Sequence, residues 1–305
     1  MVLILGSLQQ GFIYALLALG IYISFRILNI PDLTAEGSFT FGLAVSAAVT
    51  VSGHPFLAIL LAVIAGALAG GVTGVIQTKI GVHPVLAGIL TMSGLYSINL
   101  MVMNKSSNLS LIGKDTIYNV IENVFGGVLS SDCVKSIASF AVMAVVLMLV
   151  ILFFKMQLGL CIRATGDNEA MVRASSINVD STKIFALALS NALIALSGGL
   201  LAQYQGFADI NSGVGILVVG LASVIIGEAF IGKRGISLGF FSAVVGSVVY
   251  RFIVAIAINF DIFPAFTLKL VSAVIVGAAL SIPAIKQKHE KNKIRKEGLK
   301  DAANK

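Results

Sequence analysis

Three ionisable residues lie within or near the ends of long apolar stretches: Glu228, Arg251 and Lys269. Charged side chains are costly inside a membrane, so those found there commonly pair with each other or handle ions and protons. Glu228 is close to Lys233 and could sit at the membrane surface, whereas Arg251 could pair with Glu228 or extend outward toward Asp261. A structural ion pair and a gating role therefore both stay open, while a single buried acid gives weak support for a proton relay.

Residues suited to nucleophilic or metal catalysis are scarce. His54 and His83 each precede a proline, and no histidine stands with Cys, Asp or Glu at the spacing of a metal site. A phosphate-binding loop requires the pattern GxxxxGK[ST], which neither Gly113-Lys114 nor Gly232-Lys233 meets. We therefore expect no metal, no cofactor and no ATP hydrolysis by this chain alone.

The charged insert at 155–183 interrupts these apolar stretches and holds seven acidic and basic residues: Lys155, Arg163, Asp167, Glu169, Arg173, Asp180 and Lys183. Asp167 is a suitable N-cap, and the acidic Glu169 favours the start of a helix. The pattern predicts a short helix over 167–176 that ends before Asn178, a residue tolerant of the left-handed conformation. Met171 and Val172 form a small apolar surface there, which could either pack on the protein's own loops or insert into the groove of a partner.

A second interruption is the sequence NIPDLTAEGS at 29–38. Pro31 cannot continue a helix, and Asp32 can cap the helix that follows. A broken helix is tolerated in a membrane only where its backbone is buried in protein or lines a watery cavity.

The elements that position these residues are long apolar segments. The chain has 305 residues, of which 57% are hydrophobic and 11% charged, and its mean hydropathy is +0.99. A membrane-crossing helix needs roughly 20 apolar residues. Candidate segments lie at 3–25, 35–52, 56–78, 84–103, 136–154, 184–204, 213–231, 236–258 and 266–285.

These segments predict an all-α polytopic bundle of about eight to nine spans, because 35–52 is short and could be re-entrant. The bundle would form one domain, 1–285, followed by a basic tail, 286–305. Gly66, Gly70 and Gly74 recur at helical spacing in one segment, which indicates a face that another helix approaches closely.

The distribution of basic residues predicts the orientation. If the segments alternate, sixteen of the lysines and arginines fall on one side, including those of the charged insert and the tail. The positive-inside rule assigns that side to the cytoplasm. The net charge of +7 then reflects topology rather than nucleic-acid binding, and the tail would be either solvated or in contact with anionic lipid headgroups.

Two stretches resemble one known family. The sequence RATGDNEAMVRASSINVDSTKIFALALSNALIALSGGLLA at 163–202 resembles the coupling-helix region of ABC-importer permeases of the branched-chain amino acid and simple-sugar group. GFIYALLALGIYISFRILNI at 11–30 resembles the first helix of those permeases, and DLTAEGSFTFG at 32–42 is similar to the segment that breaks a helix near their translocation path. HPVLAGILTMSGLYSINL at 83–100 resembles the subgroup assigned to aromatic amino acids such as tryptophan and tyrosine.

The resemblance implies a permease that pairs with a second copy or a paralogue in the plasma membrane. It would bind two cytosolic ATP-binding subunits, which hold the ATP, and receive its solute from an external binding protein at 104–135. The residues implied in ATPase coupling are Asp167, Asn168, Glu169, Met171, Val172 and Arg173. Those implied in the translocation path are Asp32, Thr34, Gly37 and Ser38.

The sequence therefore favours the membrane subunit of an ATP-driven importer for a small solute, with an amino acid as the expected cargo. A secondary transporter or channel that works without ATP is the main alternative, although buried carboxylates are few. A membrane enzyme or a passive scaffold is a third alternative.

Overall fold

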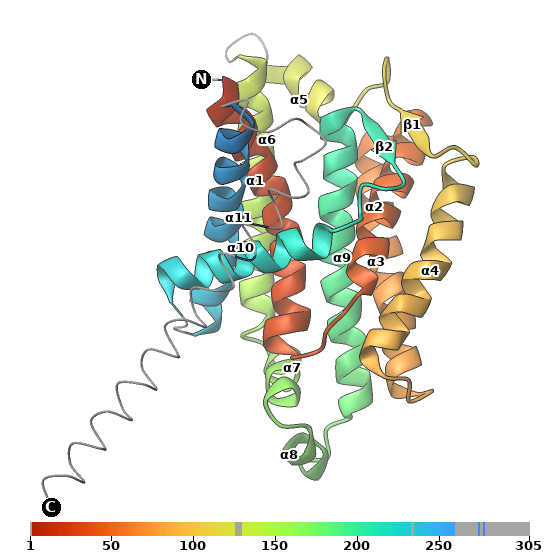
Figure 1. Ribbon diagram of the computed structural model, residues 1–305, viewed down its shortest axis with the longest axis vertical. Coiled ribbons are helices and arrows are strands. Elements are labelled where there is room, and N and C mark those ends of the chain that lie inside the picture. Colours follow the sequence, from red (N-terminus) through yellow and green to blue (C-terminus); the bar gives the residue numbers. More distant parts are fainter. Residues whose placement is uncertain (1, 126–129, 233–234, 260–273, 275–276, 278–305) are drawn as a thin grey trace, which may run out of the picture.

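A computed structural model describes residues 2–125, 130–232, 235–259, 274 and 277 (Figure 1). These residues are mostly helical, with two short strands. The elements in chain order are α1 (Val2–Ile21), the π-helical turn η1 (Tyr22–Ile27), α2 (Thr34–Val51), α3 (Pro55–Thr78), α4 (Pro84–Val102), β1 (Asn108–Ser110), α5 (Ile117–Phe125), α6 (Ser131–Phe153), α7 (Gln157–Asp167), α8 (Glu169–Ala174), α9 (Val179–Gln205), β2 (Phe207–Asp209), α10 (Ile216–Ile231) and α11 (Ile236–Asn259).

Six helices of the described part are long and apolar enough to cross a membrane. They are α1 continued by η1, α3, α4, α6, α9 and α11. The prediction of a helical bundle with several membrane-crossing helices is therefore confirmed, but the count of eight to nine spans stays a prediction. Apart from residues 274 and 277, the last predicted span, 266–285, lies outside the described residues. The tail, 286–305, and the boundary between the two predicted domains lie outside them entirely.

The long helices stand roughly side by side and define two ends of the bundle (Figure 1). At one end, which we call the sheet end, β1 and β2 pair antiparallel with Leu109 opposite Ala208. Helix α5 also lies there, where the backbone N–H of Ile117 donates to Oε1 of Gln203 at 2.8 Å. Burial raises the pKa of the Tyr118 phenol on α5 to about 12, so this residue stays neutral beside the Ser139 hydroxyl. At the opposite end, the α8 end, α7 follows α6 and α8 lies beyond the ends of the long helices.

Helix α10 lies across the bundle rather than along it (Figure 1). It has 16 residues, fewer than the predicted span 213–231, because Gly215 takes a left-handed φ of 82° and the helix begins only after it. Helix α10 is therefore not among the six helices of the described part that are long enough to cross a membrane, and the predicted span at 213–231 stays a prediction. Apolar composition alone does not distinguish a helix that crosses a membrane from one enclosed by other helices.

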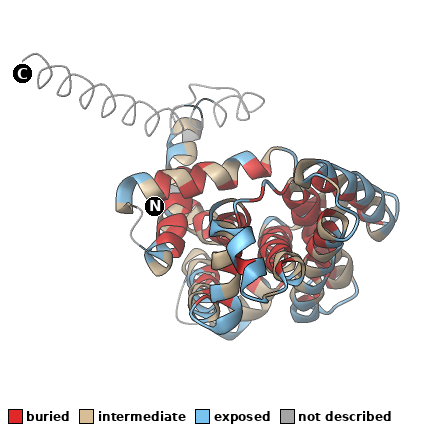
Figure 2. Cartoon of the chain, turned by 90° about the horizontal axis from the view of Figure 1, so that it is seen from below, coloured by how far each residue is buried: buried red, intermediate tan, exposed pale blue. Residues whose placement is uncertain are grey.

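The core of the bundle lies around α9, whose residues from Ser190 to Gln203 are all buried. In Figure 2 the buried residues gather where helices face one another, and exposed residues cover the outer faces. A Cβ atom at Gly66 or Gly70 would overlap a backbone carbonyl of α9, which confirms the close approach predicted from the glycine spacing. The outer faces of α3, α4 and α6 expose large apolar side chains such as Leu68, Leu90 and Met148, as a lipid-facing surface requires.

Replacing Gly42 with Ala is expected to lower the thermal stability of the purified protein. Gly42 packs α2 against α9, and a Cβ atom there would overlap the carbonyl oxygen of Ala195, so the two backbones must move apart. Overpacking of this kind costs about 1–3 kcal/mol. Gly71→Ala is the matched control, because a Cβ atom there meets nothing within 4 Å. Equal unfolding temperatures for the two variants in detergent would contradict this account of the α2–α9 contact.

Candidate functional site

The broken segment at 28–33 joins η1 to α2. Helix α2 begins part of the way along the bundle rather than at the end where η1 stops (Figure 1). The N–H of Leu28 still bonds to the carbonyl of Ile23 at 2.9 Å, but Asn29 takes a left-handed φ of 54° and Pro31 lacks an N–H. The chain then turns back into the bundle, and α2 starts there rather than at a membrane surface (Figure 1). The predicted break is confirmed for 29–33, whereas 34–38 already belongs to α2.

Asp32 is fully buried beside the middle of α9 and holds the broken segment in place. One carboxylate oxygen accepts the Thr34 backbone N–H at 2.9 Å, so Asp32 bonds to the first residue of α2 as predicted, although the N-cap position itself is occupied by Leu33. The other oxygen accepts a hydrogen bond from the side-chain amide of Asn191 at 2.6 Å. The Thr34 hydroxyl pairs with that of Thr73 on α3 at 2.8 Å. These contacts fix the start of α2 against both α9 and α3.

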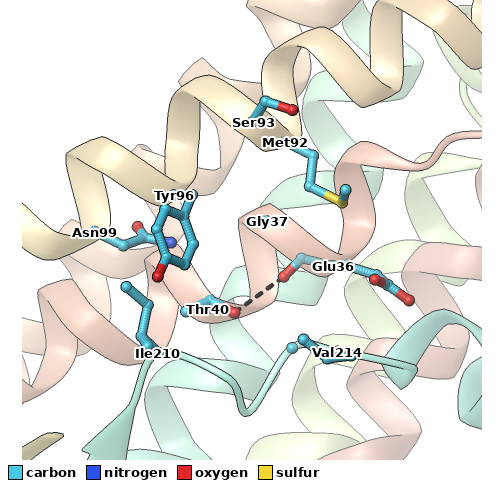
Figure 3. Close-up of a pocket in the computed structure, with 10 residues that line it drawn as sticks. Glu36, Gly37, Thr40, Met92, Ser93, Tyr96, Asn99, Ile210 and Val214 are labelled. Atoms are coloured by element: carbon cyan, nitrogen blue, oxygen red, sulfur yellow. Dashed lines mark hydrogen bonds between the residues drawn. The ribbon is translucent and has the colours of Figure 1, made fainter. Parts of the chain in front are cut away.

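Of the four residues predicted to line a path, Gly37 lines the cavity beside α2, whereas Asp32, Thr34 and Ser38 are fully buried and do not line it. The cavity measures about 350 Å³ and lies between the first turns of α2, the middle of α4 and the linker that joins β2 to α10 (Figure 3). Its lining residues are Glu36, Gly37, Thr40, Met92, Ser93, Tyr96, Asn99, Ile210, Gly213 and Val214.

The lining combines an apolar and aromatic surface with hydroxyl, amide and carboxylate groups. Met92, Tyr96 and Val214 supply the apolar part, and Thr40 and Asn99 are among the polar residues. A cavity of this size and composition suits a small organic molecule that has an apolar body and a few polar groups. Within the described residues no three His, Cys, Asp or Glu side chains gather as a metal site would require.

The linker that forms one wall of the cavity is tied to α2. The Gly215 N–H, at the start of α10, donates to Oε1 of Glu36 at 3.0 Å. Gly213 lies so close to α2 that a Cβ atom there would overlap the Thr40 hydroxyl. The cavity wall therefore cannot move independently of the first turns of α2.

The far end of α10 carries Glu228, which pairs with Arg26 of η1. The Arg26 Nε atom lies 2.6 Å from Oε1 of Glu228, and the terminal nitrogen contacts the second oxygen. Arg251 instead lies 3.4 Å from the ring centroid of Tyr14 and donates to the side chain of Gln10 at 3.3 Å. The considered pairing of Arg251 with Glu228 is therefore wrong, and Asp261, the other partner considered, lies outside the described residues.

The charged insert forms two short helices rather than one. Asp167 ends α7, and Asn168 takes an extended conformation and accepts the Met171 N–H on its side chain at 3.1 Å. The predicted helix 167–176 with Asp167 as its cap is wrong because Asn168, an equally good capping residue, performs this role. The helix ends at Ala174, where Ser176 takes the left-handed conformation predicted for Asn178. Asn178 instead caps α9.

The exposure of the two apolar residues on α8 differs sharply. Met171 is 63% exposed, whereas Val172 is 2% exposed. The predicted joint surface of Met171 and Val172 is therefore wrong at Val172, which packs within the chain, and of these two apolar residues it is Met171 that projects from α8. Glu169 pairs with Lys183, and Arg173 with Asp180 at 3.2 Å, so these charges hold α8 to α9.

The insert also contacts the broken segment directly. The side-chain amide of Asn29 donates to the Gly166 carbonyl at 3.1 Å, and a Cβ atom at Gly166 would overlap the Ile27 carbonyl oxygen. Since only Asn168 separates α7 from α8, these contacts join the charged insert to the residues that precede α2.

Three residues of this region were not singled out from the sequence: Asn99 and Tyr96 in the cavity and Asn191 at the buried carboxylate. An amide within a strongly apolar segment was the available signal for both asparagines, because polar groups inside a membrane need partners. The partner of Asn191 could not be inferred, since Asp32 is distant in the sequence.

Comparisons with known proteins agree with this architecture. Residues 3–281 match the family model described as "Branched-chain amino acid transport system / permease component". The chain is 37% identical to a tyrosine transport system permease protein of Clostridioides difficile, over 91% of this chain and 90% of the relative. It is 26% identical to the ribose import permease protein RbsC of Haemophilus influenzae, over 82% and 75% of the two chains. It is 23% identical to a probable branched-chain amino acid transport permease protein LivH of Methanocaldococcus jannaschii, over 72% of each chain.

No solved structure matches the chain. The family match covers the broken segment, the cavity and the charged insert together, and the relatives are named as transport permeases for amino acids and an import permease for ribose. This chain therefore belongs to the permease family of branched-chain amino acid transport systems.

Proposed function

We propose that this chain is the plasma-membrane permease subunit of an ABC importer and that it carries an amino acid through the cavity beside α2. The observation that carries the proposal is the physical continuity from α8 to the cavity. The chain of contacts runs from α7 through the Gly166–Asn29 hydrogen bond to the broken segment, and then to the first turns of α2.

The positions of basic residues at the two ends of the bundle support an orientation in the membrane. Lys79, Lys155 and Arg163 lie near the α8 end, which the positive-inside rule assigns to the cytoplasm. The C-terminal tail would lie on this side, near anionic lipid headgroups. The sheet end would then face outward, where Lys114, Asp115 and Glu122 are available to a solute-binding protein.

The mechanism is alternating access driven by partner subunits. Two cytosolic ATP-binding subunits close on ATP and move α8, and a second permease copy or a paralogue supplies the other half of the passage. Because α8 is linked to the broken segment, this movement shifts α2 and the cavity wall attached to Glu36. A ligand-bound state of the external protein would bias the same equilibrium from the opposite end.

An amino acid is the cargo that the cavity suits best. Tyr96 and Met92 offer a surface for an aromatic or aliphatic side chain, while Thr40 and Asn99 offer hydrogen-bonding groups. The similarity to a permease named for tyrosine supports an aromatic amino acid.

The test is uptake into proteoliposomes that contain the permease, its ATP-binding subunits and its solute-binding protein. We expect amino-acid uptake only with ATP and all components, and we expect the binding protein to stimulate ATP hydrolysis. The control is the permease alone under a proton or sodium gradient. Uptake by the permease alone would overturn the proposal in favour of a secondary transporter or channel.

A further inference from the structure

Helix α10 is held at both of its ends by charged side chains that lie on opposite sides of the broken segment. At its start, the Gly215 N–H donates to Oε1 of Glu36, in the first turn of α2, at 3.0 Å. At its far end, Oε1 of Glu228 accepts a hydrogen bond from Nε of Arg26, in η1, at 2.6 Å. Arg26 precedes the broken segment and Glu36 follows it, so α10 and these two contacts connect η1 to α2 a second time (Figure 1).

Helix α10 is also packed tightly against α11. A Cβ atom at Gly227 would overlap the carbonyl oxygen of Ser242, and one at Gly246 would overlap the carbonyl oxygen of Ser223. Close-packed interiors of this kind have low compressibility, so the two helices are expected to move as one body. With 16 residues and a rise of 1.5 Å per residue, α10 is about 24 Å long. A shift at its far end would therefore reach the linker that forms one wall of the cavity.

The ion pair at the far end of α10 lies where the charged insert reaches η1. A Cβ atom at Gly166 would overlap the carbonyl oxygen of Ile27, the residue that follows Arg26. The side chain of Arg26 is 38% exposed, and that of Glu228 is 10% exposed. Water can solvate the guanidinium when it leaves the carboxylate, whereas the partner of a fully buried charge would be left uncompensated. This ion pair is therefore placed and solvated in a way that allows it to open.

We propose that α10 is a lever between the charged insert and the cavity, with the Arg26–Glu228 ion pair as its latch. While the pair is closed, α10 keeps Gly213 and Val214 against the first turns of α2. When the insert displaces η1, the pair separates and the cavity wall is released. The proposal rests on the proposed function, because the ATP-binding subunits supply the movement, and it adds a second connection to the one through the broken segment.

The test compares Glu228→Gln, Arg26→Gln and the exchanged pair Arg26→Glu/Glu228→Arg in the complete reconstituted complex. Each single variant removes the ion pair, and the exchange restores it with the charges reversed. Coupling between two sites typically corresponds to about 5- to 150-fold effects. At the lower end of this range, we expect each single variant to hydrolyse about fivefold more ATP per amino acid imported, and the exchanged pair to return close to the original ratio. Lys79→Gln is the matched control, because it removes an ion pair with Asp180, at 3.5 Å, that does not involve α10.

A second measurement follows the cavity wall directly and does not depend on transport. Spin labels on Ser93→Cys and Val214→Cys, with Cys133 and Cys161 replaced by serine, report the distance between α4 and the linker across the cavity (Figure 3). We expect the single variants to broaden the distribution of this distance and the exchanged pair to narrow it again. An ion pair that only stabilised the fold would change the unfolding temperature and leave the distribution as it was.

The outcomes separate the lever from the importer class. An unchanged distance distribution in both single variants overturns the lever, whatever the ATP ratio. Changes that the exchanged pair does not reverse overturn it as well, because they would arise from the individual residues rather than from their pairing. If the complex without substitutions in the ion pair imports no amino acid with ATP, the proposed function fails, whereas the distance measurement still decides whether the ion pair holds the cavity wall.

Discussion

Replacing Met171 with Asp is expected to lower the rate of ATP-driven uptake at least tenfold, while the permease still folds. Met171 is the large apolar side chain that projects from α8, at 63% exposure. If it occupies a groove of the ATP-binding subunit, a carboxylate there would be buried without a partner. Truncating a central contact of this type typically costs about 2 kcal/mol or more, which is roughly a thirtyfold change in affinity. The measurement is uptake together with co-purification of the ATP-binding subunits.

Two further substitutions distinguish docking from folding. Val172→Asp is expected to reduce the yield of folded protein, because Val172 is 2% exposed and its replacement buries a charge. Ser181→Asp adds the same charge at an exposed site in the first turn of α9, where an acidic residue suits the helix dipole, and should leave uptake unchanged. Undiminished uptake and ATPase stimulation in Met171→Asp would contradict the assignment of α8 as the coupling helix.

The charged insert shows which features of a short helix can be predicted from neighbouring residues and which cannot. The presence of a short helix was predictable, because charges and capping residues interrupt the apolar pattern there. Its boundaries were not, because Asp167 and Asn168 are adjacent and both favour capping. The burial of Val172 rather than Met171 was also not predictable, since a helix of six residues has no periodic apolar face and its packing depends on α7 and α9.

In the broken segment, too, some features could be predicted from neighbouring residues and others depend on residues far away in the chain. Pro31 and Asp32 predicted the break and the capping of α2 from neighbouring residues alone. The depth at which α2 begins depends on Asn191 and Thr73, which are far away in the chain. The cavity could not be predicted for the same reason, because α4 and the β2–α10 linker form it only after the bundle has assembled.

Replacing Asn191 with Asp is expected to destabilise the bundle strongly, and adding Asp32→Asn is expected to restore most of the stability. The Asn191 amide donates to the Asp32 carboxylate at 2.6 Å inside the bundle, so Asn191→Asp would bring two acidic groups into contact. Removing the partner of a buried charged group typically lowers the free energy of unfolding by about 3–5 kcal/mol. The double variant exchanges the two side chains and recreates an amide-to-carboxylate bond between the same positions. The amide oxygen introduced by Asp32→Asn would still offer an acceptor to the Thr34 N–H.

Thermal unfolding of the four proteins in detergent forms a double-mutant cycle that isolates this contact. Asn119→Asp is the matched control, because Asn119 is exposed on α5 and its replacement adds the same charge at a solvated site. If the bond also carries movement from the α8 end to the cavity, the exchanged pair should recover ATP-driven uptake along with stability. A double variant no more stable than Asn191→Asp would show that the contact does not hold the start of α2 against α9.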